Sequence, residues 1–308
     1  MHPTLADIRA ARTRIAPYIR RTPLLRADEP GLWLKLENLQ ATGSFKARGA
    51  LNKLLTLDDD ARARGLVTAS GGNHGAAVAF AGRQAGVPTT IYVPDNTVAL
   101  KRRKIRAFGA ELVVEGGYFD EANTAALARA EADRRTYIHP FADPAVIAGQ
   151  GTVGLEILED LPAVTTLLVA IGGGGLISGI ALAARSLQPK LKIVGVEPVG
   201  CPTLRASMAA GAVVALERID TRVATMAARS TAPINLAIAV EHVAEIVLVE
   251  DDAMLAAARH LWLTYGIAAD LSAAAGLAAL QTGAYRPGPN ERVCTLVCGA
   301  GDDGIAAA

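Results

Sequence analysis

The chain has 308 residues, and its 31 lysines and arginines nearly balance its 30 aspartates and glutamates, which gives a formal net charge of +1. This balance argues against a general attraction to nucleic acid or to acidic membranes, and the 4% aromatic content argues against base-stacking surfaces. Hydrophobic residues make up 51% of the sequence and predict a large core, whereas three cysteines do not make a disulfide framework and favour a cytoplasmic location.

Apolar runs of strand length alternate with helical patterns along nearly the whole chain. The expected strands are residues 32–36, 66–69, 89–93, 111–114, 136–139, 165–171, 192–197, 244–249 and 292–297. The expected helices include residues 45–57, 73–85, 98–108, 121–135, 145–159, 176–187 and 251–265. Continuous apolar strands separated by helices are typical of parallel sheets that helices cover on both faces. The sequence therefore predicts an α/β fold.

A lysine stands at the predicted start of the helix 45–57, in the segment Gly43-Ser44-Phe45-Lys46. This position is unusual because the helix dipole favours anions at the N-terminus. One interpretation is a surface lysine whose stem packs on the helix. The other is a lysine that its surroundings keep partly neutral, so that Lys46 can form a Schiff base.

A second junction, Ser70-Gly71-Gly72-Asn73-His74-Gly75, follows the predicted strand 66–69. Its glycines let the backbone approach a ligand, and the start of the following helix offers free N–H groups to an anion. Serine and asparagine here could equally be N-caps, and a single histidine is more often packed than catalytic. The pattern alone leaves an anion-binding loop and a structural turn open.

A third junction consists of four consecutive glycines, Gly172 to Gly175, after the predicted strand 165–171. Four glycines cost backbone entropy, and close strand–helix packing is expected to need only one or two of them. We therefore interpret the run as a phosphate nest at a helix start. There is no Gly-Lys-Ser/Thr, which excludes a P-loop, and the G-x-G-x-x-G fingerprint is incomplete. Glu197, which ends the next predicted strand, keeps a nicotinamide-binding module as a minor alternative.

Two further classes of site are not expected. Residues 161–184 carry no charge and are long enough to span a bilayer, but the central glycines indicate a strand, a turn and a helix instead. No metal site is predicted, because Cys294 and Cys298 lie four apart on a predicted strand and the five histidines are scattered.

Taken together, a Schiff-base lysine, an anion-binding loop and a phosphate nest suggest pyridoxal phosphate. The chain resembles the threonine/serine dehydratases and serine racemases of the fold-type II pyridoxal-phosphate family. The motifs that carry this resemblance, in the family's order, are Arg21–Leu24, Lys35–Gln40, Gly43–Ala50, Ser70–Gly75, His139–Phe141, Gly149–Thr152, Gly172–Leu176, Gly195–Pro198 and Cys298-Gly299.

The resemblance implies a fold like that of the tryptophan synthase β chain, with two open, twisted, mostly parallel sheets covered by helices. Residues 1–49 and 143–308 would form a large cofactor-binding domain, and residues 50–142 a small domain. The resemblance also implies a homodimer. The expected partner is a small amino-acid substrate, with no nucleic acid and no membrane.

By the same resemblance, Lys46 would hold pyridoxal 5'-phosphate as an imine, with Phe45 beside the ring. Asn73 would hydrogen-bond the phenolic oxygen of the ring, and Cys298 would lie beside the pyridine nitrogen. The residues expected to bind the substrate carboxylate are Ser70, Gly71, Gly72, Asn73 and His74. The residues expected to bind the phosphate are Gly172, Gly173, Gly174, Gly175 and Leu176.

A thiol beside the pyridine nitrogen does not enforce ring protonation, which disfavours a long-lived carbanion and suits elimination. Lys46, released when substrate binds, would be the base for the Cα proton. The expected function is a dehydratase, an ammonia-lyase that converts serine, threonine or a similar β-hydroxy amino acid to a 2-oxo acid and ammonia. The alternatives are a serine racemase, a β-replacement enzyme and a non-catalytic cofactor-binding relative.

Three departures from the family pattern bear on the choice among these functions. Gly71 stands where the racemases carry a serine, and glycine cannot transfer a proton to the opposite face of the substrate. Asp270 replaces a glutamate. The segment Cys298-Gly299-Ala300-Gly301 replaces the usual Gly-Gly-Asn ending, which leaves this wall of the site undefined by the sequence.

Overall fold

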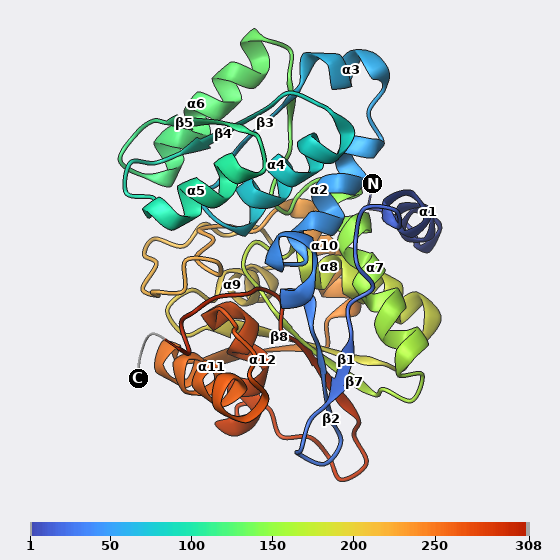
Figure 1. The fold of residues 1–308 in the computed structure, drawn as a ribbon. Helices are drawn as coiled ribbons and strands as arrows, with labels where there is room; N and C mark the ends of the chain where they lie inside the picture. Colours follow the sequence, from blue (N-terminus) through green and yellow to red (C-terminus); the bar gives the residue numbers. More distant parts are fainter. Residues whose placement is uncertain (1, 306–308) are drawn as a thin grey trace.

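The computed structural model describes residues 2–305 and contains two sheets, each with helices packed against it (Figure 1). The strands of the larger sheet are β1 (Leu24–Arg26), β2 (Leu32–Lys35), β7 (Thr166–Ala170), β8 (Lys192–Pro198), β9 (Glu245–Val249) and β10 (Val293–Leu296). They lie in the order β1-β2-β10-β7-β8-β9. All neighbours are parallel except β1 and β2.

The smaller sheet is parallel throughout and lies at the top of Figure 1. Its strands are β3 (Leu66–Ala69), β4 (Thr89–Val93), β5 (Glu111–Val114) and β6 (Thr136–Tyr137), in the order β5-β4-β3-β6. The prediction of two mostly parallel sheets is thereby confirmed.

The helices cover both sheets and connect them. They are α1 (Leu5–Ile15), α2 (Lys46–Leu55), α3 (Asp59–Arg64), α4 (Asn73–Ala85), α5 (Ala99–Ala107), α6 (Phe119–Ala132), α7 (Pro144–Asp160), α8 (Gly175–Leu187), α9 (Thr203–Ala210), α10 (Pro233–His242), α11 (Asp251–Tyr265) and α12 (Leu271–Gln281). Two 3₁₀ turns, η1 (Glu37–Leu39) and η2 (Ala41–Gly43), precede α2. Among residues 2–305, no helix has the length and apolar character needed to cross a bilayer.

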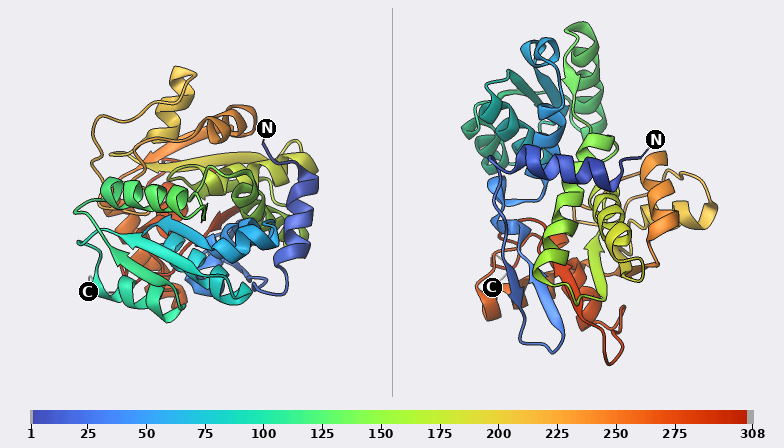
Figure 2. Two further views of the ribbon diagram at one scale, coloured as in Figure 1. Left: turned by 90° about the horizontal axis from the view of Figure 1, so that it is seen from above. Right: turned by 90° about the vertical axis from the view of Figure 1, so that its right-hand side faces the viewer.

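The helices α2 and α7 connect the two sheets. α2 packs on α4, which belongs to the smaller sheet, and also on α7, which packs on α8 of the larger sheet. The side view in Figure 2 shows α1 lying across the middle of the molecule, where it contacts α7. A fixed α2–α7 pair therefore sets how the two sheets face each other.

Each sheet has its own apolar core. The larger core gathers buried side chains of β7, β8, α8, α11 and α12, and the smaller core gathers those of α2, α4, β3 and β4. The buried residues Ala47, Ala50, Leu51 and Leu54 of α2 belong to the smaller core. Domain boundaries near residues 49/50 and 142/143 stay predictions.

Candidate active site

Lys46 is the first residue of α2, and its side chain is partly buried. Its ammonium donates a hydrogen bond to the carbonyl oxygen of Pro140 at 2.7 Å and lies 5.2 Å from the centre of the Phe45 ring. Desolvation by burial lowers the pKa of Lys46 to about 8. At pH 7 about one amine in ten is then neutral, which is the form that attacks a carbonyl carbon.

Phe141, which follows the Pro140 that Lys46 contacts, packs against the glycine run. A Cβ built at Gly173 would lie 2.3 Å from the ring of Phe141, and one at Gly175 would lie 2.8 Å from the Cα of Phe141. A Cβ at Gly172 would lie 2.9 Å from the Thr225 carbonyl oxygen. The fourth glycine, Gly174, has φ +99°, where other residues are strained.

The expectation that close packing needs only one or two of these glycines is therefore wrong. The phosphate hypothesis no longer rests on an unexplained run of glycines, and rests instead on the helix that follows. α8 begins at Gly175, and the N–H groups of its first turn, including that of Leu176, have no partner within the helix. Such a terminus binds anions.

The loop from Ser70 to Gly75 joins β3 to the start of α4. The hydroxyl oxygen of Ser70 accepts a hydrogen bond from the N–H of Gly72 at 3.2 Å. A Cβ at Gly72 would meet nothing within 4 Å, whereas a Cβ at Gly71 would lie 2.7 Å from the side chain of Thr97. The loop is therefore open on the side of Gly72 and closed on the side of Gly71. The first N–H groups of α4, which have no partner within the helix, lie next to this loop, at the carboxyl end of β3.

The ring of His74 points into the smaller lobe. Its Nε2 lies 2.9 Å from the Ile138 carbonyl oxygen and 3.1 Å from the Thr68 hydroxyl, and the residue is only 5% exposed. Burial lowers its pKa to about 3, so the ring is neutral. Only the backbone N–H of His74 is left to contact a substrate.

A hydrogen-bonded chain runs from Cys298 to Asn73 through two residues to which the sequence analysis gave no role in the site. The thiol sulfur of Cys298 lies 3.5 Å from the hydroxyl oxygen of Ser272, which lies 2.6 Å from Oδ1 of Asp270. Oδ2 of Asp270 accepts a hydrogen bond from Nδ2 of Asn73 at 3.2 Å. No local sequence pattern signals such a contact, because the link spans 197 residues of sequence.

The Cys298 end of this hydrogen-bonded series lies close to Lys46. The N–H of Phe45 donates to the Cys298 carbonyl oxygen at 3.2 Å, and Ser44 pairs with Gly299 in an isolated bridge. Burial raises the pKa of the Cys298 thiol, so the group is neutral. The structure thus brings together Phe45, Lys46, Asn73 and Cys298, and connects them to the glycine run through Pro140 and Phe141.

Glu197, the basis of the nicotinamide alternative, has another role. Its carboxylate oxygens accept hydrogen bonds from the N–H groups of Leu204 at 2.7 Å and Arg205 at 3.0 Å, at the start of α9. The side chain is fully buried, and burial raises its pKa to about 7. A carboxylate committed to a helix start has no oxygen to offer a ribose, so this alternative is wrong.

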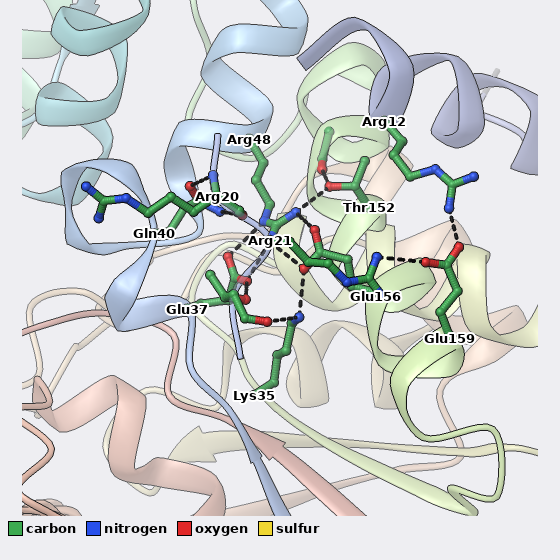
Figure 3. Close-up of polar contacts among 12 residues, drawn as sticks. Arg12, Arg20, Arg21, Lys35, Glu37, Gln40, Arg48, Thr152, Glu156 and Glu159 are labelled. Carbon is green, nitrogen blue, oxygen red and sulfur yellow. Dashed lines mark hydrogen bonds and ion pairs between the residues drawn. The ribbon is translucent and has the colours of Figure 1, made fainter. Parts of the chain in front are cut away.

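A buried ion network anchors α2, and Figure 3 shows its side chains converging; they come from β2, η1, α2 and α7. The Arg48 guanidinium bonds Glu37 at 2.7 and 2.8 Å and Glu156 at 2.7 Å, and Lys35 bonds Glu156 at 2.7 Å. Two cations are balanced by two carboxylates, which removes the cost of burying an uncompensated charge. Because Arg48 follows Lys46 by two residues, the network fixes the start of the helix that carries the lysine.

The residues present fit pyridoxal phosphate. An amine without a contacting carboxylate suits an aldehyde, the start of α8 suits a phosphate, and a neutral thiol suits a pyridine nitrogen. The hydroxyl of Ser44, two residues before Lys46, is buried without a hydrogen-bond partner and remains available to a bound group. Within residues 2–305, no group of three His, Cys, Asp or Glu side chains is arranged to hold a metal ion.

Comparison with known proteins agrees with this fit. The family described as pyridoxal-phosphate dependent enzyme matches residues 15–299. The chain is 40% identical over 283 residues to an L-threonine ammonia-lyase of Thermotoga maritima, which covers 90% of this chain and 71% of that protein. Maize serine racemase superposes with a TM-score of 0.93 at 32% identity, over 97% of this chain and 94% of that one. The threonine deaminase isoform 2 of Solanum lycopersicum, in its processed form, superposes with a TM-score of 0.91 at 33% identity, over 96% and 88%.

These matches confirm both the resemblance and the fold class. They also confirm the cofactor, since the matched family is defined by it. The chain therefore belongs to the family of pyridoxal-phosphate dependent enzymes.

Proposed function

We propose that this enzyme is an ammonia-lyase that eliminates water from L-threonine, L-serine or a similar β-hydroxy amino acid and yields a 2-oxo acid and ammonia. The observation that carries the proposal is the position of Lys46 beside Cys298, which follows β10: the N–H of Phe45, next to Lys46, donates to the Cys298 carbonyl oxygen at 3.2 Å. The 40% identity with a threonine ammonia-lyase over most of the chain supports the reaction class.

Bound pyridoxal phosphate supplies an aldehyde for the Lys46 amine and a ring that withdraws electrons from the substrate Cα. Lys46 would hold the cofactor and, as a free amine, would accept the Cα proton of the substrate. Its pKa of about 8 suits a base that works near neutral pH. The Pro140 carbonyl accepts a hydrogen bond from the Lys46 nitrogen and so orients it.

The remaining contacts follow from the geometry at the two helix starts. The first-turn N–H groups of α8, from the segment Gly172–Leu176, would bind the phosphate, and Asn73 would donate to the phenolic oxygen. The substrate carboxylate would lie at the start of α4, on the open face of Ser70–Gly72, with the backbone rather than the ring of His74. Cys298 would face the pyridine nitrogen.

Racemisation is the less favoured alternative. Gly71 has no side chain to exchange a proton, and Thr97 fills the space where a larger residue would project. A β-replacement enzyme and a non-catalytic relative share the same cofactor contacts, so the products distinguish them. We further propose a homodimer in the cytoplasm, with the small domain spanning residues 50–142.

The test begins with the absorbance spectrum of the purified protein after addition of pyridoxal phosphate. An imine is shown if borohydride removes the absorbance band and the pyridoxyl group is then found attached to Lys46. Incubation with L-threonine and L-serine should then release equal amounts of 2-oxo acid and ammonia. An imine without either product would indicate a non-catalytic relative. D-serine as the main product would identify a racemase, and a β-substituted amino acid would identify a β-replacement enzyme.

A further inference from the structure

Asp270 lies where several parts of the site meet. It is the N-cap of α12, and its Oδ1 accepts hydrogen bonds from the Ala273 N–H at 2.9 Å and the Ser272 hydroxyl at 2.6 Å. Its Oδ2 accepts one from Nδ2 of Asn73 at 3.2 Å. The residue is 9% exposed. Oδ1 therefore caps α12, and Oδ2 holds Asn73, the residue that the proposed function places beside the cofactor.

The C-terminal segment closes over this carboxylate. A Cβ at Gly299 would lie 2.5 Å from Oδ2 of Asp270, and a Cβ at Gly301 would lie 2.7 Å from its Cα. Packing thus explains the glycines of the segment Cys298-Gly299-Ala300-Gly301, because only glycine lets the backbone pass this close to Asp270. The enclosure leaves little of Asp270 exposed to solvent, which strengthens its hydrogen bond with Asn73.

The direction of the hydrogen bonds follows from the donors. The Ala273 N–H can only donate and the Ser272 hydroxyl can donate, so an ionised carboxylate satisfies both contacts of Oδ1. The start of α12 and the Lys104 ammonium, which faces Asp270 from α5, favour this ionised form. Burial and the neighbouring Asp303 raise the pKa of Asp270, and the Cys298 thiol is the other titratable group facing it.

An ionised Asp270 leaves Asn73 a single orientation. The amide must turn Nδ2, not Oδ1, toward Oδ2 of Asp270, because two acceptors repel each other. The second hydrogen on Nδ2 then remains for another acceptor. If Asp270 were replaced by a group that donates, Asn73 would flip and present its oxygen instead.

We propose that Asp270 is a positioning residue that holds the Asn73 amide as a hydrogen-bond donor to the phenolic oxygen of bound pyridoxal phosphate. This inference rests on the proposed function, since that function places Asn73 beside the cofactor. Donation to the phenolic oxygen stabilises the anion that remains when the imine with Lys46 loses its proton. Asp270 therefore acts through Asn73 to keep the imine pKa low.

The test variant is Asp270→Asn, which keeps an N-cap residue for α12. With its Oδ1 held by the Ala273 N–H, Asn at position 270 turns its own NH2 toward Asn73 and forces the flip. The imine pKa, measured by spectrophotometric titration of the holoenzyme, should rise by about one to two units, the value expected for losing one hydrogen bond to a charged group. If the variant acted only by removing the negative charge of Asp270, the imine pKa would fall instead, because the protonated imine would be less stable.

Asp303→Asn is the matched control. Asp303 accepts a hydrogen bond from the Leu271 N–H at 3.0 Å, so the variant removes a neighbouring negative charge without touching Asn73. Its imine pKa should stay unchanged or fall. In an Asn73→Ala background, where the proposed link is already absent, Asp270→Asn should no longer raise the imine pKa.

Each outcome decides the matter. An unchanged or lower imine pKa in Asp270→Asn, or an equal rise in the Asn73→Ala background, overturns the inference while the proposed function stands. Absence of any borohydride-reducible imine in the unaltered enzyme overturns the proposed function instead. Should Asp270→Asn not fold, Asp270→Ser also caps the helix and leaves Asn73 free to turn either way, so it must raise the imine pKa as well, by less than Asp270→Asn is expected to.

Discussion

Arg48 and Glu37 form a doubly hydrogen-bonded ion pair in which both side chains are fully buried, with Nε–Oε2 and Nη2–Oε1 distances of 2.8 and 2.7 Å. The planar guanidinium matches the carboxylate at two points, which a lysine could not do. The pair joins α2, whose first residue is Lys46, to the 3₁₀ turn that follows β2. It therefore connects the helix that begins with Lys46 to the larger sheet.

Glu37→Gln should destabilise the protein strongly, because it leaves the Arg48 charge buried with only Glu156 opposite. A broken buried pair costs about 3–5 kcal/mol. The free energy of unfolding in urea measures this cost. Arg218→Gln is the control, since its ion pair with Asp220 is largely exposed and should contribute at most about 1 kcal/mol. Equal effects of the two variants would contradict the role assigned to the network.

Lys46→Ala should abolish both the reducible absorbance band and the release of 2-oxo acid, because the proposed function assigns the cofactor anchor and the base to this one amine. Lys53→Ala is the matched control on the same helix, where Lys53 pairs with Asp143 at 2.7 Å. That variant should retain the band. Circular dichroism of both variants checks the fold, and turnover near the unaltered rate in Lys46→Ala would remove Lys46 from the mechanism.

The rate of imine formation should depend on pH through Lys46. Only the neutral amine attacks, and burial lowers the pKa of Lys46 from 10.5 to about 8. When pyridoxal phosphate is mixed with the apoenzyme, the rate should rise about tenfold per pH unit below pH 8 and level off above it. Stopped-flow absorbance measures the rate. A continued rise toward pH 10 would show that the amine has an ordinary lysine pKa.

Helices and strands could be predicted well where the apolar residues followed a single helical or strand pattern. The bounds of β3, β4, β5, α4 and α11 agree with the sequence prediction to the residue. By contrast, α12 has no separate prediction, because nine of its 11 residues are buried and it is apolar all round. Without a polar face there is no stripe of period 3.6 to distinguish a helix from a loop or a strand.

The sequence could group the proposed site residues but not the directions of their side chains. Motifs indicated Lys46, Asn73 and Cys298, which follow the carboxyl ends of β2, β3 and β10 and lie in one region of the structure. The core position of the His74 ring depends on the Ile138 carbonyl, 64 residues away, and no local pattern reports such a contact. The contact of Asp270 with Asn73 is hidden for the same reason.

The last prediction concerns Gly71, which is the residue that separates elimination from racemisation in the proposed function. Its φ lies outside the left-handed region, so a side chain there meets no backbone strain. Gly71→Ser alone should nevertheless perturb the loop, because its Cβ would lie 2.7 and 2.8 Å from the Thr97 side-chain atoms. The double variant Gly71→Ser/Thr97→Ala removes that overlap.

In the double variant a hydroxyl should reach the face of the substrate opposite Lys46, and D-serine should form from L-serine at a measurable rate. The single variant Thr97→Ala is the control and should eliminate water without racemising. Chiral chromatography separates the two enantiomers, and a pyruvate assay gives the rate of elimination in the same sample. If the unaltered enzyme already made D-serine as fast as pyruvate, Gly71 would not be the residue that prevents proton transfer, since the second acid–base group would have to come from elsewhere in the site.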